Sequence, residues 1–248
     1  MEKAGSPRDQ GDGGTSTGRG GTGASTSVLA GWGGEAAEVA GQCASIALMR
    51  GEAWRVSRDD NAGLVAVEEG FVLVSTDAGN VNGRPGNRRI VLATGDRGTM
   101  LVPPALGERI EALTPSQITI VSGDSLRVLL GLPMVAETIF DACAEALRER
   151  QATIRNCAYV HHSERVLEKL LQLARIYGRA IPGGGVRIDF PLTHQLVADM
   201  VASARETVSL ALSDLARQGL LQSQHPRYVL RIAPRELFST VRTSVGVP

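Results

Sequence analysis

The sequence has no long hydrophobic run, no cysteine cluster and no net charge, and each absence excludes a class of protein. No apolar run approaches the roughly 20 residues that cross a bilayer. The three cysteines, Cys43, Cys143 and Cys157, are widely spaced, so the chain offers neither a CxxC zinc site nor four thiolates for an iron–sulfur cluster. We therefore expect no metal site. A formal net charge of zero argues against a protein that coats nucleic acid with its whole surface.

The N-terminus and the remainder of the chain differ in composition. Residues 1–34 are Gly, Ser, Thr and charged residues with almost no large apolar side chain, which predicts a disordered tail. This segment has no apolar core of a secretory signal, so we predict a cytoplasmic protein without membrane contact. Residues 163–248 carry 11 of the 26 basic but only 7 of the 26 acidic side chains. This local basic excess favours a nucleic-acid contact in the C-terminal part.

Apolar residues recur at helical spacing twice within residues 192–221. In the first run Leu192, Leu196 and Met200 share one face, and Thr193 is a suitable N-cap. The second run has one apolar face, which we expect to be buried: Val208, Ala211, Leu212 and Leu215. We expect the opposite face to be exposed: Arg205, Glu206, Ser209 and Leu210. Two short helices around a tight break predict a helix-turn-helix whose second helix enters a major groove.

The letters of this region resemble the CRP/FNR superfamily of bacterial transcription regulators. ARETVSLALSDLARQGLL is similar to the family's recognition helix, which this resemblance assigns to about residues 203–216. Upstream, SERVLEKLLQLARIYGRAIPGGGVRIDFPLTHQLVADMV resembles the linker helix, a short strand and the first helix of the motif. Downstream, QSQHPRYVLRIAPREL resembles the wing. The resemblance implies a winged helix-turn-helix domain over residues 163–248.

Residues 35–132 resemble the family's β-roll sensor domain. In residues 35–48 the apolar side chains recur at helical spacing. The residues after them form short runs typical of β-strands, separated by turn residues. LVAVEEG and FVLVS predict two strands about Gly70, DAGNVNGRPGN a long hairpin loop, and RRIVLAT and ITIVS two further strands. The expected fold class is α+β, with the β-roll ahead of the DNA-binding domain.

The cassette that holds a cyclic nucleotide in this family is altered. It uses a Gly-Glu pair and an Arg-Ser pair, which here align with Gly98–Thr99 and Leu106–Gly107. A different register would use Arg97 or Arg109 and the Gly107–Glu108 dipeptide. A buried phosphate needs a cation. We therefore predict no binding of cyclic AMP in the usual way. The candidate effector pocket is Thr99, Leu101, Val102, Leu106 and Gly107, and an apolar effector or a collapsed pocket without ligand fits it.

Residues 133–162 predict one long helix. Its apolar residues alternate steps of three and four, the pattern of a two-stranded coiled coil, and in the family this helix forms a homodimer. The expected dimer seam is Phe140, Cys143, Leu147, Ile154 and Cys157. The two cysteines are either a redox switch or, as we favour, small buried hydrophobes. His161–His162 is expected at a hinge, and haem stays open as a cofactor because the family has gas-sensing members.

The resemblance also implies the residues that touch double-stranded DNA. Arg205 is expected to bind guanine and Glu206 cytosine, with Ser209 one turn further along the helix. Leu210 stands where the family commonly has arginine, which predicts an altered preference at one base, for instance through contact with a thymine methyl. Expected phosphate contacts are Thr193, His194, Ser203 and Arg227.

These observations predict a homodimeric transcription regulator that recognises an inverted repeat. The alternatives are a regulator controlled by a partner protein or by no ligand, and a haem, gas or redox sensor of the same architecture. RNA polymerase is a further candidate partner, and the effector is unknown. An enzyme is disfavoured because no nucleophile and base come together in the sequence, and SGDS at 122–125 fits a strand-to-helix turn.

Overall fold

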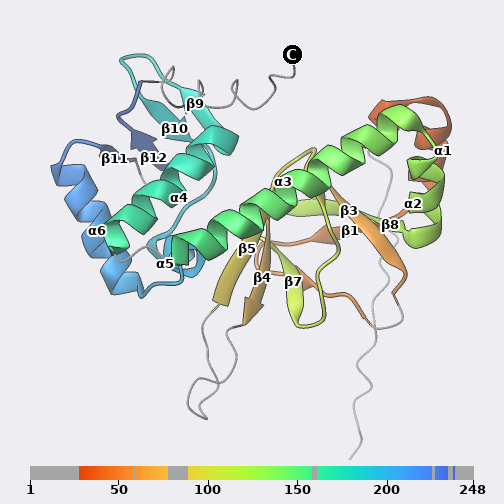
Figure 1. Cartoon of the computed structure of the whole chain (residues 1–248), viewed down its shortest axis with the longest axis horizontal. Coiled ribbons are helices and arrows are strands. Elements are labelled where there is room, and N and C mark those ends of the chain that lie inside the picture. The colour runs from red at the N-terminus through yellow and green to blue at the C-terminus, as the bar shows by residue number, and fades with distance from the viewer. Residues whose placement is uncertain are drawn as a thin grey trace, which may run out of the picture.

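The computed structural model describes residues 28–57, 60–77, 89–157, 161–224, 227–233 and 237. A sheet-rich N-terminal half is followed by one long helix and a smaller C-terminal half (Figure 1). The chain is therefore of the expected α+β class. The predictions of a disordered tail over residues 1–27 and of a loop over most of DAGNVNGRPGN lie outside the described residues.

The N-terminal half contains two four-stranded antiparallel sheets. Its strands are β1 (Ala44–Leu48), β2 (Ala53–Trp54), β3 (Ala62–Glu69), β4 (Val72–Asp77), β5 (Arg89–Gly95), β6 (Met100–Leu101), β7 (Glu108–Ala112) and β8 (Ser116–Ser122). The first sheet has the order β1-β8-β3-β6 and the second the order β2-β7-β4-β5. The two sheets enclose one apolar core, to which both contribute.

Strand β3 shows how the sequence produces this layering. Val65 and Val67 lie in the core between the sheets, whereas Leu64 and Ala66 lie in a second core against helices. Because side chains alternate along a strand, an apolar residue at every position fits a strand covered on both faces. The predicted strands on either side of Gly70 are confirmed, but they belong to different sheets and do not form a hairpin.

The second core corrects two expectations for the N-terminus. Leu29 is buried and Trp32 packs against the same cluster, so the segment from residue 28 is part of the fold and not of a disordered tail. The helix expected over 35–48 is shorter. It ends at Gln42 as α1 (Gly34–Gln42), and residues 44–48 pair with β8 as β1. This pairing outweighs the weak helical pattern of the segment.

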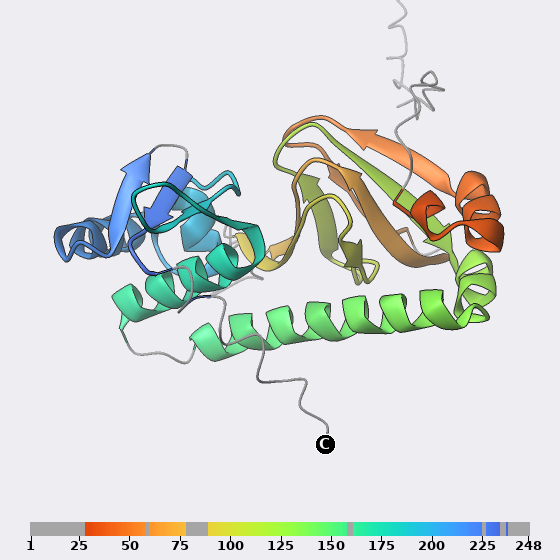
Figure 2. The same ribbon diagram turned by 90° about the horizontal axis from the view of Figure 1, so that it is seen from above.

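Helix α3 (Pro133–Cys157) follows α2 (Gly123–Leu130), which Ser122 caps as the expected strand-to-helix turn. Figure 2 shows α3 running alongside the sheets. Val135 and Ile139 are buried on this side. The opposite face exposes Phe140, Leu147 and Ile154 by 72%, 57% and 73%.

Only part of the expected seam lies on this exposed face. Cys143 is half-buried and packs on the second core of its own chain, because it faces the sheets more than its heptad partners do. Cys157 is the last residue of α3, and its side chain lies outside the described residues. Arg150 also turns toward the sheets, where its guanidinium pairs with Glu108 at 3.0 Å.

The described C-terminal half has three helices, which pack against a third sheet of four strands, in the order β11-β12-β10-β9. Its elements are α4 (His162–Tyr177), β9 (Gly178–Ala180), β10 (Val186–Ile188), α5 (His194–Met200), α6 (Arg205–Arg217), β11 (Leu221–Gln224) and β12 (Arg227–Leu230). The core of this half also takes in Leu73 and Val91 from the second sheet of the β-roll. The two halves therefore share apolar contacts.

A buried polar network crosses the junction of the two halves. The Glu149 carboxylate on α3 accepts from the Thr94 N–H at 3.1 Å and from the Thr94 hydroxyl at 2.9 Å. Lys169 on α4 lies 3.8 Å from the same carboxylate, and Tyr177 donates to the Thr94 hydroxyl at 3.0 Å. Burial raises the pKa of Glu149 and lowers the pKa of Lys169. Each ion therefore depends on the other to remain charged in this apolar surrounding.

We expect Lys169→Met to lower the free energy of unfolding by about 3–5 kcal/mol, because it leaves a buried carboxylate without its cation. Glu149→Gln combined with Lys169→Met should cost less than the two single changes added together, by about 1–3 kcal/mol. Urea denaturation of the four proteins measures this coupling. Additive losses would show that the two groups do not stabilise each other.

Candidate nucleic-acid interface

Helices α5 and α6 form the predicted helix-turn-helix. Thr193 caps α5, since its hydroxyl accepts from the Leu196 N–H at 3.1 Å. Leu192, Leu196 and Met200 are buried as expected. Ala202 lies in the turn with φ +49°, a left-handed conformation that costs a residue with a Cβ roughly 1–2 kcal/mol. The chain keeps this tight turn although an alanine rarely adopts the conformation.

Helix α6 has the two faces that its periodicity predicts. Val208, Ala211, Leu212 and Leu215 are buried in the C-terminal core. On the opposite side four side chains line one shallow surface depression: Arg205, Glu206, Ser209 and Leu210. Leu210 is 70% exposed. Figure 1 shows α6 at the outer end of the molecule, away from the β-roll.

Ser209 is held by two contacts within the motif. Its hydroxyl donates to the Arg205 carbonyl at 2.9 Å and lies 2.8 Å from Nδ1 of His194, the first residue of α5. His194 therefore contacts the recognition helix directly. The sequence placed both residues at the DNA surface, and the structure shows that they also contact each other.

Ser203 does not have the position that the sequence predicted. It is buried, and its hydroxyl lies 3.1 Å from Nδ1 of His162 at the start of α4. It therefore faces the interior and not a phosphate. It also does not cap α6, which begins at Arg205 and ends at Arg217 in place of the expected 203–216. Its N-cap is Ala204, and within the described part of the chain no side chain caps it.

Arg227 begins β12 and belongs to a cluster of arginines around Asp189. Its Nε lies 4.0 Å from the Asp189 carboxylate, which also pairs with Arg179 at 2.9 Å and Arg187 at 2.7 Å. The hydrogen bond from Arg187 and the nearby arginines lower the pKa of Asp189 below its usual value. Three arginines around one carboxylate leave an excess of positive charge on this sheet.

A cavity of about 250 Å³ lies between the β-roll, α3 and α4. Its lining is Thr94, Gly98, Thr99, Met100, Leu101, Ala142, Glu145, Ala146, Glu149, Ile176 and Tyr177. Thr99 and Leu101 were expected here. Val102, Leu106 and Gly107 do not line it, because Val102 and Leu106 are exposed and Gly107 lies in a turn with φ +90°.

The charges around this cavity do not suit a phosphate. Its lining residues, as the structure describes them, include the carboxylates of Glu145 and Glu149 and no basic side chain. Arg109, which another register of the cassette would use, pairs with Asp77 at 2.8 Å. Glu108 pairs with Arg150. Both residues are thus occupied by ion pairs within the protein.

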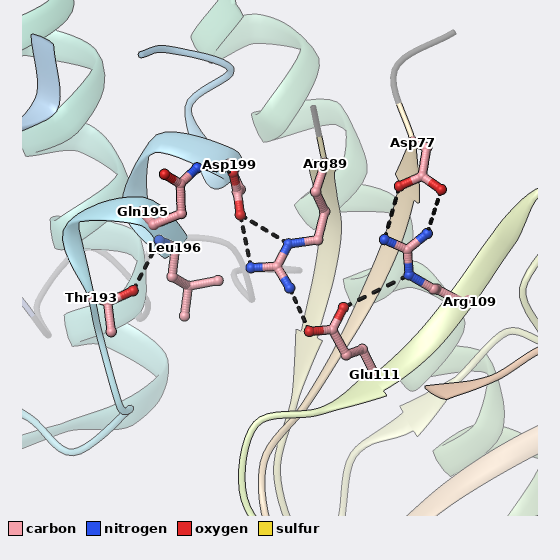
Figure 3. Close-up of polar contacts among 8 residues, drawn as sticks. All are labelled: Asp77, Arg89, Arg109, Glu111, Thr193, Gln195, Leu196 and Asp199. Carbon is pink, nitrogen blue, oxygen red and sulfur yellow. Dashed lines mark hydrogen bonds and ion pairs between the residues drawn. The ribbon is translucent and has the colours of Figure 1, made fainter. Parts of the chain in front are cut away.

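Figure 3 shows a second polar contact between the halves, the Arg89 cluster. The Arg89 guanidinium on β5 binds Glu111 on β7 at 2.5 Å and Asp199 on α5 at 2.7 Å. Asp199 is buried and also accepts from the Gln195 amide at 2.8 Å. Sequence reasoning missed this cluster because its partners are up to 110 residues apart. It ties the first helix of the DNA-binding motif to the β-roll.

Comparison with known proteins agrees with this geometry. Residues 164–237 match the model of the Crp-like helix-turn-helix domain. The chain is 32% identical over 114 residues to a CRP-like cAMP-activated global transcriptional regulator of Mycobacterium tuberculosis, and 29% identical over 111 residues to the global nitrogen regulator of Synechococcus elongatus. These matches cover 45% and 44% of this chain, and the chain spans about half the length of each curated relative.

Solved structures share the whole architecture. A CooA mutant from Carboxydothermus hydrogenoformans has a TM-score of 0.71 at 18% identity, covering 86% of this chain and 94% of its own. FixK2 from Bradyrhizobium japonicum has a TM-score of 0.63 at 22% identity, covering 79% and 95%.

Fold and site together define a two-domain protein, a β-roll joined by a long helix to a winged helix-turn-helix. The chain shares this architecture with the solved structures above. Its residues 164–237 match the Crp-like helix-turn-helix domain, and the curated relatives that it matches over half their length are regulators. None of the helices that the structure describes is long and apolar enough to cross a membrane.

We expect Arg89→Met to lower the free energy of unfolding by about 1–3 kcal/mol, because Asp199 then stays buried without a cation. Amide hydrogen exchange in α5 should become faster, since α5 loses its tie to β5. Arg127→Met is the matched control, because Arg127 pairs with Asp124 on an exposed surface and should cost under about 1 kcal/mol. Equal losses in both variants would contradict a special role for Arg89.

Proposed function

We propose that the protein is a homodimeric, sequence-specific DNA-binding regulator that recognises an inverted repeat. The observation that carries this proposal is the grouping of Arg205, Glu206, Ser209 and Leu210 on one open face of α6. Arginine binds guanine and glutamate accepts from the cytosine amino group in a major groove. His194 contacts Ser209 of this face, and Thr193, His194 and Arg227 are proposed phosphate contacts. The proposed division is a sensor domain over 35–132, a dimerisation helix over 133–162 and a DNA-binding domain over 163–248.

The exposed stripe on α3 supports the dimer. Phe140, Leu147 and Ile154 are seven residues apart, and each leaves most of its side chain open to solvent. Leaving such side chains in water forfeits about 1.5–3 kcal/mol each. A second copy of α3 would cover them as a coiled coil does. Two recognition helices would then contact half-sites one DNA turn apart, about 34 Å.

We infer that the protein is not controlled by cyclic AMP in the way its Mycobacterium tuberculosis relative is named for. The described lining of the cavity offers a cyclic phosphate no basic side chain, and Arg109 is bound elsewhere. The apolar walls suit an uncharged small molecule, and a ligand there would contact Ile176 and Tyr177 of α4 directly. The alternative is control by a partner protein or by no ligand, and RNA polymerase is a further candidate partner. The proposed place of action is the cytoplasm, where bacterial DNA lies.

The proposed function is tested by selecting bound sequences from random DNA duplexes with the full chain. We expect an inverted repeat, unchanged when cyclic AMP is added. Arg205→Ala should lower affinity for the selected duplex about 5- to 150-fold per half-site, since a bidentate contact to guanine is worth about 1–3 kcal/mol. Arg217→Ala, at the far end of α6, is the control and should change affinity much less. Selection of no sequence, or equal losses for both arginines, would contradict the proposal.

The dimer is tested by placing a charge on the stripe. Leu147→Glu should convert the protein from dimer to monomer, because two carboxylates would meet in an apolar seam. Thr138→Glu, an exposed position on the same helix away from the stripe, should leave the dimer intact. Sedimentation equilibrium measures both masses. A monomeric unmodified chain, or a Leu147→Glu variant that stays dimeric, would contradict the role of this face.

A further inference from the structure

Leu210 is an apolar side chain that shares the outer face of α6 with three polar ones. It is 70% exposed, and the residues that share its surface depression are Arg205, Glu206 and Ser209. It lies four residues after Glu206, so the two side chains are neighbours one helical turn apart. Since α6 buries its other face completely in the C-terminal core, Leu210 has no route into the protein interior.

The neighbour of Leu210 is limited in what it can recognise. The Ser209 hydroxyl donates its one proton to the Arg205 carbonyl at 2.9 Å and lies 2.8 Å from His194 Nδ1. A serine hydroxyl has one donor and two acceptor positions. Ser209 therefore keeps only an acceptor for DNA. Thymine offers no donor in the major groove, so Ser209 has nothing to accept from it, whereas the adjacent Leu210 can contact its methyl group.

The major groove displays one apolar group, the C5-methyl of thymine. The other base edges there are hydrogen-bond donors and acceptors, which a leucine would leave unsatisfied. Contact with the methyl group would bury apolar surface on both sides without that cost.

We propose that Leu210 selects thymine at one position of each half-site by packing on its C5-methyl group. This inference rests on the proposed DNA recognition and specifies its chemistry. The Leu210 contact distinguishes T·A from the other pairs by an apolar contact, whereas Arg205 and Glu206 distinguish bases by hydrogen bonds. Removing a buried methyl group costs about 0.8 kcal/mol, which corresponds to a fourfold loss of affinity per half-site.

Deoxyuridine differs from thymidine only in lacking this methyl group, so it isolates the proposed contact. Each thymine of the selected half-site is replaced in turn by deoxyuridine, and binding to the full chain is measured by fluorescence anisotropy. We expect a loss of about fourfold at one thymine when one half-site is changed, and about 15-fold when both are. With Leu210→Ala that position should bind thymine and uracil equally. Leu130→Ala, which truncates an exposed leucine on α2, is the matched control and should keep the full uracil effect.

The outcomes separate the two proposals. Failure to select any duplex would overturn both. A selected duplex that shows no uracil effect at any thymine, or the same uracil effect with Leu210→Ala as with the unmodified chain, would overturn the role of Leu210 and leave DNA recognition in place. Because the Leu210 side chain is mostly in solvent, the alanine variant should unfold in urea at the same midpoint as the unmodified chain.

Discussion

The docking of the C-terminal half on the outer face of the second β-sheet is the contact on which the arrangement of the chain depends. Strand β4 places Val72 and Val74 in the core of the β-roll and Leu73 in the core of the C-terminal half. Just before β4, the centre of the Phe71 ring lies 5.9 Å from that of Tyr177 and 5.3 Å from that of Phe190, and both pairs pack edge to face. A strand covered on both faces needs a continuous apolar run. The letters FVLVS are this run.

Two polar contacts make this apolar docking specific. Glu149 with Lys169, and Arg89 with Asp199, lie at different places along the junction. Apolar surfaces alone tolerate sliding, but a buried ion that loses its partner costs several kcal/mol. The recognition helix is therefore held at a defined place relative to the β-roll. A ligand changes that place only if it binds another arrangement more tightly.

The helix-turn-helix was predictable because its information is local. The spacing of Leu192, Leu196 and Met200, and the cap at Thr193, lie within nine residues, and the structure confirms each of them. Strand positions were also predictable, but their partners were not, since β3 and β4 are adjacent in sequence and separate in the sheets. Pairing depends on contacts between distant segments, which one sequence does not display.

The errors at the site have the same origin. Ser203 was expected at the surface because the family resemblance implied a phosphate contact, but its partner His162 is 41 residues away. Leu106 was assigned to a pocket because Leu106–Gly107 aligns with one pair of the family's cassette, yet Leu106 lies at an exposed turn. The Arg89 cluster joins residues that no local pattern relates. In each case the local sequence does not indicate whether the side chain is buried or which residue it contacts, because the tertiary fold determines both.

At the start of α6, burial of the apolar face offsets unfavourable local conformation and capping. Ala202 adopts a left-handed conformation, at about 1–2 kcal/mol, and in the described chain Ala204 begins the helix without a side-chain cap, at about 1 kcal/mol. Against these costs, Val208, Leu212 and Leu215 are buried, each worth about 1.5–3 kcal/mol. The buried face therefore fixes the position of α6, and the turn follows it. The residues of the outer face carry little of this stability, so they are free to vary with the DNA sequence that the protein recognises.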